Sequence, residues 1–179
     1  RDYYCQSRRG NRLFELGLSD VALALCACQG SALAGSADDF DFWVGRWALT
    51  WGSDGQATNT VAKVLDGKVI QEQFDARPND RLVGLSLSVY DAKSDEWKQT
   101  WADNTGAYLD FTGGLNPDGT MELFRPATSE DGDPMLQRMV WYNIRGNSLD
   151  WNWERSLDGG QSWETVWKIH YERIKVSGR

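Results

Sequence analysis

From residue 38 onward, the chain alternates large apolar and polar residues over short runs, and turn-forming residues separate these runs. A repeat of two residues places successive side chains on opposite faces, as in half-buried β-strands. Asp66-Gly67 and Asn104-Thr105-Gly106 lie between such runs and predict tight hairpin turns. The predicted strands cover residues 43–51, 56–65, 68–75, 82–90, 96–103, 107–112, 120–125 and 137–144, followed by a closing hairpin over residues 147–173. Within residues 43–51, Gly45 favours either a bend in the strand or a short helical lead-in.

This succession of hairpins predicts an all-β fold, an up-and-down antiparallel β-barrel of about eight to ten strands, because closure removes exposed strand edges. The barrel domain is expected to span residues 38–175. An N-terminal extension of residues 1–37 precedes it, and a tail of residues 176–179 follows it. A barrel of this size leaves an interior wide enough for one small ligand.

The turn of the closing hairpin, Ser156 to Trp163, matches the Asp-box pattern S-x-D-x-G-x-[ST]-W. In this pattern the Asp158 carboxylate is expected to accept hydrogen bonds from backbone N–H groups of its own turn, clamped by Ser156 and Trp163. Gly160 would supply a backbone conformation with positive φ. Since Asp boxes in glycosidase propellers repeat from blade to blade and this chain has one, the motif predicts a structural role, which is to fix the hairpin register.

The composition argues against several classes of function. The chain has 10 Trp, a formal net charge of −7, and no run of Lys or Arg after residue 38. Binding to nucleic acid or to an anionic membrane surface is therefore not expected. All 3 Cys lie in the first 28 residues and His170 is the single His, so no multi-histidine or cysteine metal site is expected in the barrel.

The first residues have the layout of a secretory signal. A basic segment, residues 7–12, precedes an apolar stretch over residues 16–28, and Ala32-Leu33-Ala34 predicts cleavage after Ala34. Ser7-Arg8-Arg9 also resembles a twin-arginine start, and Leu25-Ala27 followed by Cys28 resembles a lipidation site. These features favour export to the periplasm, the extracellular space or an organelle lumen. If the extension is not a signal, an intracellular protein is expected.

Other interpretations of the extension stay open. Glu15 and Asp20 lie in or beside the apolar stretch, which is too short to span a bilayer as a helix. Residues 1–37 could instead tether the barrel to a larger, even membrane-bound, complex that docks on its outer surface. In that case the protein would be an accessory subunit.

Several blocks of the chain carry a family resemblance. Gly45-Arg46-Trp47 resembles the G-x-W signature of the first lipocalin strand, in which the Trp fills the closed end of the barrel. Together with residues 41–44, 89–91, 97–104, 108–114 and 153–156, it is similar to an uncharacterised group of bacterial lipocalin-like proteins of the calycin superfamily, over about residues 39–173. The resemblance implies a barrel and export, and it implies no activity.

Candidate pocket residues share strand faces with the tryptophans. If Trp101 faces inward, Gln99 and Asp103 do too, and Trp153 brings Arg155 with it. Buried polar groups need partners, so these either form an internal network, for example Arg155 with Asp103, or line a ligand pocket. The full predicted set is Gln99, Trp101, Asp103, Tyr108, Arg138, Trp153, Arg155, Trp167 and Tyr171.

The leading hypothesis is an exported barrel that binds a small, partly polar or aromatic molecule without catalysis. An alternative is an isomerase or cyclase that uses Asp103 or Glu72 as general base and Tyr108 as acid. No cofactor is expected. A minor alternative is haem ligation by His170, although this residue alternates with the Trp face and is expected to face solvent.

Overall fold

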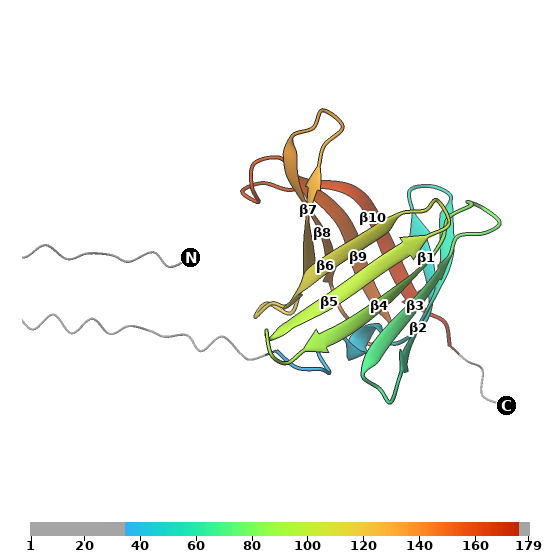
Figure 1. Ribbon diagram of the computed structural model, residues 1–179. Coiled ribbons are helices and arrows are strands. Elements are labelled where there is room, and N and C mark those ends of the chain that lie inside the picture. The colour runs from blue at the N-terminus through green and yellow to red at the C-terminus, as the bar shows by residue number, and fades with distance from the viewer. Residues whose placement is uncertain (1–34, 176–179) are drawn as a thin grey trace, which may run out of the picture. The chain divides into compact units, whose positions relative to one another are not determined.

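The structure is a computed structural model that describes residues 35–175, and these residues form a closed barrel of ten antiparallel strands (Figure 1). Each strand pairs with its sequence neighbours, and β1 pairs with β10 to close the barrel. The prediction of an all-β up-and-down barrel is thus confirmed. The strands are β1 Gly45–Trp51, β2 Gly55–Val64, β3 Val69–Asp75, β4 Val83–Asp91, β5 Glu96–Asp103, β6 Tyr108–Leu115, β7 Met121–Thr128, β8 Pro134–Tyr142, β9 Ser148–Ser156 and β10 Glu164–Arg173.

Residues 1–34 and 176–179 lie outside the described residues. The signal-like segment, its Ala34 cleavage site, the twin-arginine start and the lipidation site at Cys28 all fall there. The tether hypothesis also rests chiefly on these residues. All of them stay predictions from the sequence.

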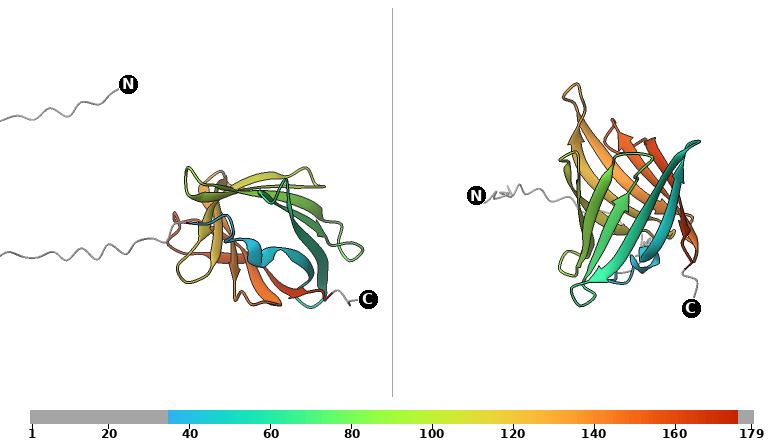
Figure 2. Two further views of the ribbon diagram at one scale, coloured as in Figure 1. Left: turned by 90° about the horizontal axis from the view of Figure 1, so that it is seen from below. Right: turned by 90° about the vertical axis from the view of Figure 1, so that its right-hand side faces the viewer.

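A short 3₁₀ helix, η1 (Asp41–Trp43), lies across one end of the barrel (Figure 2). It places Trp43 under the barrel interior, and Trp47 of β1 is completely buried beside it. The Trp47 indole N–H donates to the Trp43 carbonyl oxygen at 2.8 Å. Of the two alternatives for the run from Trp43 to Trp51, the structure thus has the short helical lead-in, and β1 starts at Gly45.

Arg173, the last residue of β10, holds this closed end together. Its guanidinium carbon lies 4.1 Å from the centre of the Trp47 ring, and the group donates to the carbonyl oxygens of Phe42 and Val44 at 3.1 and 2.7 Å. Gly45 has φ of 149°, and a Cβ there would collide with the guanidinium. Glycine at position 45 therefore leaves the space that Arg173 needs.

Strand β4 places small polar residues on its inner face and larger apolar residues on its outer face. Ser86 and Ser88 are fully buried inside the barrel, whereas Leu85, Leu87 and Val89 are exposed on its outer surface. Gly84, also on the inner face, lies under the Trp101 ring, and a Cβ there would overlap it. The strand thus contributes small polar residues to the interior and leaves room for the indole.

The Asp-box turn has the hydrogen bonds that the motif predicts. The Asp158 carboxylate accepts from the backbone N–H groups of Gln161 and Ser162 at 3.0 and 2.9 Å, and from the Ser156 and Ser162 hydroxyls at 2.8 and 2.6 Å. These bonds, first of all the one from Ser162, hold the pKa of Asp158 well below its usual value. Gly160 has φ of 92°.

Trp163 does not clamp the Asp158 carboxylate. Its ring covers the Arg138 guanidinium at 4.1 Å and packs 5.9 Å from the Phe124 ring. The even spacing of Trp163 and Trp167 predicts that both face inward, but a β-bulge between Thr165 and Trp167 changes the alternation of β10, and Trp163 does not line the cavity described below.

We expect Asp158→Ala to lower the thermal denaturation midpoint by a few degrees, because the turn loses the acceptor for two backbone N–H groups. Asp158→Asn is the matched variant and should recover part of the loss, because its amide oxygen can still accept. The midpoints are measured by circular dichroism. An unchanged midpoint in Asp158→Ala would show that the turn does not contribute to stability.

Candidate functional site: an aromatic cavity with a buried carboxylate

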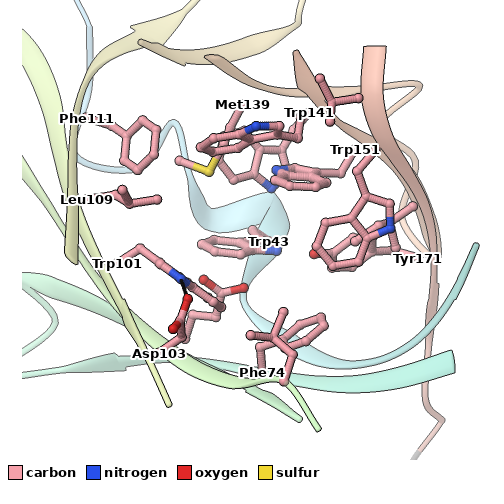
Figure 3. Close-up of a pocket in the computed structure, with 16 residues that line it drawn as sticks. Trp43, Phe74, Trp101, Asp103, Leu109, Phe111, Met139, Trp141, Trp151 and Tyr171 are labelled. Carbon is pink, nitrogen blue, oxygen red and sulfur yellow. Dashed lines mark hydrogen bonds between the residues drawn. The ribbon is translucent and has the colours of Figure 1, made fainter. Parts of the chain in front are cut away.

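The barrel encloses a cavity of about 260 Å³ (Figure 3). Nine of its sixteen lining residues are aromatic, and Leu82, Leu109, Met139, Val166 and Ile169 add apolar surface. Among the described residues, the only charged ones in the lining are Glu72 and Asp103. The aromatic residues are Trp43, Phe74, Trp101, Phe111, Trp141, Trp151, Trp153, Trp167 and Tyr171.

Inward-facing side chains of the strands form the walls of the cavity, and η1 contributes to its closed end. Trp151 and Trp153 on β9, and Trp167 and Tyr171 on β10, are spaced by even numbers of residues and so share the inner face. Trp43 from η1 contributes from the closed end. At the opposite end, Val166 is 53% exposed and also lines the cavity. The cavity is therefore reached from the open end of the barrel, where β5 ends and β10 begins.

Glu72 is the one carboxylate buried in the cavity wall. Glu72 is 6% exposed, and its carboxylate oxygens accept hydrogen bonds from Asn59 Nδ2 and from the Ser86 hydroxyl, both at 2.6 Å. Desolvation raises the pKa of Glu72 to about 7, although both hydrogen bonds act in the opposite direction. Among the described residues, no Lys, Arg or His forms an ion pair with it.

Tyr171 and Asn59 extend this polar group. The Tyr171 hydroxyl lies 3.5 Å from Asn59 Nδ2, and Asn59 Oδ1 is buried without a hydrogen-bond partner. Burial, and secondarily the charge of Glu72, raises the pKa of Tyr171 well above its ordinary value. Tyr171 is therefore a neutral hydroxyl at the cavity wall.

Asp103 stands at the open end and is fully ionised at neutral pH. Desolvation raises its pKa, but hydrogen bonds from the Thr105 hydroxyl, the Trp101 indole and the backbone N–H groups of Thr105 and Ala107 outweigh it, so that its pKa is lowered. The predicted pair of Asp103 with Arg155 is wrong. Arg155 is bonded to Glu164 at 2.9 Å instead.

The structure brings together five of the nine predicted pocket residues. Trp101, Asp103, Trp153, Trp167 and Tyr171 all line the cavity. Gln99 is buried inside the barrel, where its Nε2 donates to the Ser88 hydroxyl at 2.8 Å, and it does not line the cavity.

The other three predicted residues lie elsewhere. Tyr108 is 65% exposed, because the inner face of β6 belongs to Leu109 and Phe111. It therefore cannot act as an acid in the cavity. Arg155 shares the inward alternation of Trp153 but lies at the open end of β9, where its side chain is exposed.

Arg138 is on the outer surface, because Met139 and Trp141 occupy the inner face of β8. It forms ion pairs with Glu154 at 2.6 Å and Glu122 at 3.3 Å, on the two neighbouring strands. This outer network, and not the ligand cavity, satisfies the guanidinium.

His170 cannot reach the cavity either. It lies on the outer face of β10, where its Nδ1 is 2.8 Å from Asp150 Oδ1. Haem inside the barrel therefore could not be ligated by this residue. Over residues 35–175 there is no group of three or more His, Cys, Asp or Glu side chains placed to hold a metal ion.

Several residues of the cavity wall are absent from the set predicted from the sequence. Trp43 and Trp141 line the cavity, and their indole nitrogens are buried without a partner. Trp43 belongs to the aromatic block 40–43, and its position depends on η1 folding under the barrel. The position of Glu72 could have been found from the alternation with Ile70 and Phe74, which shares its buried face.

Comparisons with known proteins add no assignment: neither a family model nor a curated protein matches the chain. In the described residues, no helix has the length and apolar character required to cross a membrane.

We expect Glu72→Gln to change how stability depends on pH. The folded state keeps the Glu72 proton to about pH 7, whereas the unfolded chain releases it near 4.5. The stability that this group contributes is thus fully present below about pH 4.5 and is lost as the pH rises through about 7. Urea denaturation should find the two proteins similar near pH 4.5 and the variant more stable by about 3 kcal/mol near pH 8. Parallel pH profiles would contradict the burial of this carboxyl.

Proposed function

We propose that the barrel binds a small, flat and partly polar organic molecule in its aromatic cavity. The observation that carries the proposal is the enclosed space of about 260 Å³, walled by nine aromatic residues, with Glu72 as its one buried ionisable carboxyl and the Tyr171 hydroxyl nearby. Apolar walls with a few convergent polar groups are typical of small-molecule sites.

The volume limits the ligand. A cavity of about 150 Å³ holds a benzene molecule. The space here, about 260 Å³, fits a molecule of one or two rings with a short side chain. An extended fatty acid is a poor fit in length, and its carboxylate would meet the acidic groups of the wall.

The family and the location are parts of the same proposal. The buried Trp47 at the closed end, covered by Arg173, supports a lipocalin-like barrel, in agreement with the resemblance of Gly45-Arg46-Trp47. Such a protein would be exported and would carry or scavenge its ligand outside the cytoplasm. Detection of the mature protein in the cell exterior or periplasm, beginning near Gly35, tests export.

We expect phenethyl alcohol, a neutral aromatic probe, to bind the wild-type barrel saturably in calorimetric titrations. Trp153→Leu should weaken this binding about tenfold, because the Trp153 ring, 5.7 Å from the Phe111 ring, forms part of the wall. Tyr108→Ala is the matched control, since Tyr108 is an exposed aromatic residue outside the cavity, and it should bind like the wild type.

Titrations are compared at equal folded fraction, checked by circular dichroism, because Trp153→Leu also removes packing. Equal losses in Trp153→Leu and Tyr108→Ala would place the site outside the cavity. No saturable binding of phenethyl alcohol to the wild type would overturn the proposal for single-ring ligands.

A second candidate function is proton transfer, which the raised pKa of Glu72 favours. A general base works best when its pKa is near the ambient pH, and the pKa of Glu72 is about 7. Asp103 is the poorer base, because its pKa is lowered. Tyr171, which lies beside Asn59, replaces the predicted Tyr108 as the nearby hydroxyl donor.

The ring opening of nitrobenzisoxazole tests this candidate, since a base need only remove one carbon-bound proton from a flat aromatic substrate. We expect the wild type to accelerate the reaction above the buffer rate, with a rise in rate through about pH 7, and Glu72→Gln to lose at least ten-fold. Asp103→Asn is the control and should keep the rate. A rate that is unchanged in Glu72→Gln would exclude Glu72 as the base.

A further inference from the structure

We propose that the ligand of this barrel is a small organic cation, an aromatic ring that carries an aliphatic amine, whose ammonium group pairs with Glu72. This inference rests on the proposed binding function and names the ligand class. It follows from the partners of Glu72, the charges around the cavity and the nature of its walls.

Glu72 lacks a cationic partner in the part of the chain that the structure describes. Its two hydrogen bonds come from neutral donors, Asn59 and Ser86, one to each carboxylate oxygen. Each oxygen can accept a further bond, so the group has unused acceptor capacity at the cavity wall. A buried carboxylate without a counter-ion is costly, and a bound ammonium would supply both the charge and the missing donors.

The groups that face Glu72 do not compensate its charge. The neighbouring strands β2 and β4 present Asn59 and Ser86, and β10 presents the neutral Tyr171 hydroxyl. The second charged residue of the lining, Asp103 at the open end, is also acidic. Within residues 35–175, the cavity lining thus contains acidic groups and no basic ones, and this distribution of charge attracts cations.

A basic residue, Arg125, lies on the inner face of β7. Its guanidinium carbon lies 5.9 Å from the centre of the Phe111 ring, and its Nη1 donates to Gln137 at 2.6 Å. Arg125 does not line the cavity and forms no ion pair with Glu72. It therefore does not occupy the position that we assign to the ligand ammonium.

The aromatic walls favour the same ligand class. Six Trp side chains line the cavity, and indole faces attract cations more strongly than other aromatic faces do. A protonated amine can therefore pair its ammonium group with the Glu72 carboxylate while the carbon atoms next to its nitrogen contact indole rings. An anionic ligand would meet two carboxylates, and a neutral one would leave the Glu72 charge unpaired.

The experiment compares three probes of nearly equal shape: phenethylamine, which is a cation, phenethyl alcohol, which is neutral, and hydrocinnamate, which is an anion. Calorimetric titrations are made near pH 8, where Glu72 is ionised, and near pH 5, where it is protonated. The proteins are the wild type, Glu72→Gln and the matched control Glu172→Gln, which removes an exposed carboxylate that does not line the cavity.

We expect the wild type near pH 8 to bind phenethylamine at least tenfold more tightly than phenethyl alcohol, and to bind hydrocinnamate most weakly. The preference for the amine should shrink near pH 5, because protonated Glu72 has no charge to offer. Glu72→Gln should lose the preference for the amine and keep its affinity for the alcohol, whereas Glu172→Gln should bind all three probes like the wild type.

Two failures can be told apart. If the alcohol binds and the amine binds no better, or if the preference survives in Glu72→Gln, the cation inference is wrong and the binding function stands. If none of the three probes binds to the wild type, both the binding function for single-ring ligands and this inference fail.

Discussion

The contact between Arg173 and Trp47 joins the two ends of the barrel wall. Strands β1 and β10 pair with each other, and unless they did, each would expose an open edge. Arg173 covers Trp47 and donates to carbonyl groups of the segment that contains η1, so that one side chain fastens the closing seam and the floor together. The cavity is consequently blind at this end and is reached from the other.

A blind aromatic cavity makes a buried carboxylate expensive. Glu72 is buried from bulk solvent, and its hydrogen bonds from Asn59 and Ser86 only partly replace solvation. This incomplete solvation raises the pKa of Glu72. Both the proposed cation site and the candidate base depend on Glu72. In the first, its carboxylate pairs with a bound ammonium group, and in the second it removes a proton from a substrate.

The alternation of residues and the turn signals were sufficient to predict the fold class. Runs with a period of two, separated by Asp-Gly and Asn-containing turns, predicted an up-and-down barrel, since these signals depend on neighbours along the chain. The hydrogen bonds of Asp158 were predictable for the same reason, because all its partners lie within four residues. Five cavity residues also followed from alternation next to Trp.

Alternation by itself does not say which face is the inner one, and only the closed tertiary structure decided this. Leu85, Leu87 and Val89 lie outside because the closed barrel places Ser86 and Ser88 inside, where Ser86 meets Glu72. The bulge in β10 and the pairing of Arg138 with its neighbouring strands likewise depend on contacts between distant residues. The sequence by itself thus determined the barrel and its turns, which are local in origin. The isolation of Glu72 among neutral partners could come only from the register between strands, because the charge around a side chain depends on residues that are brought together by folding.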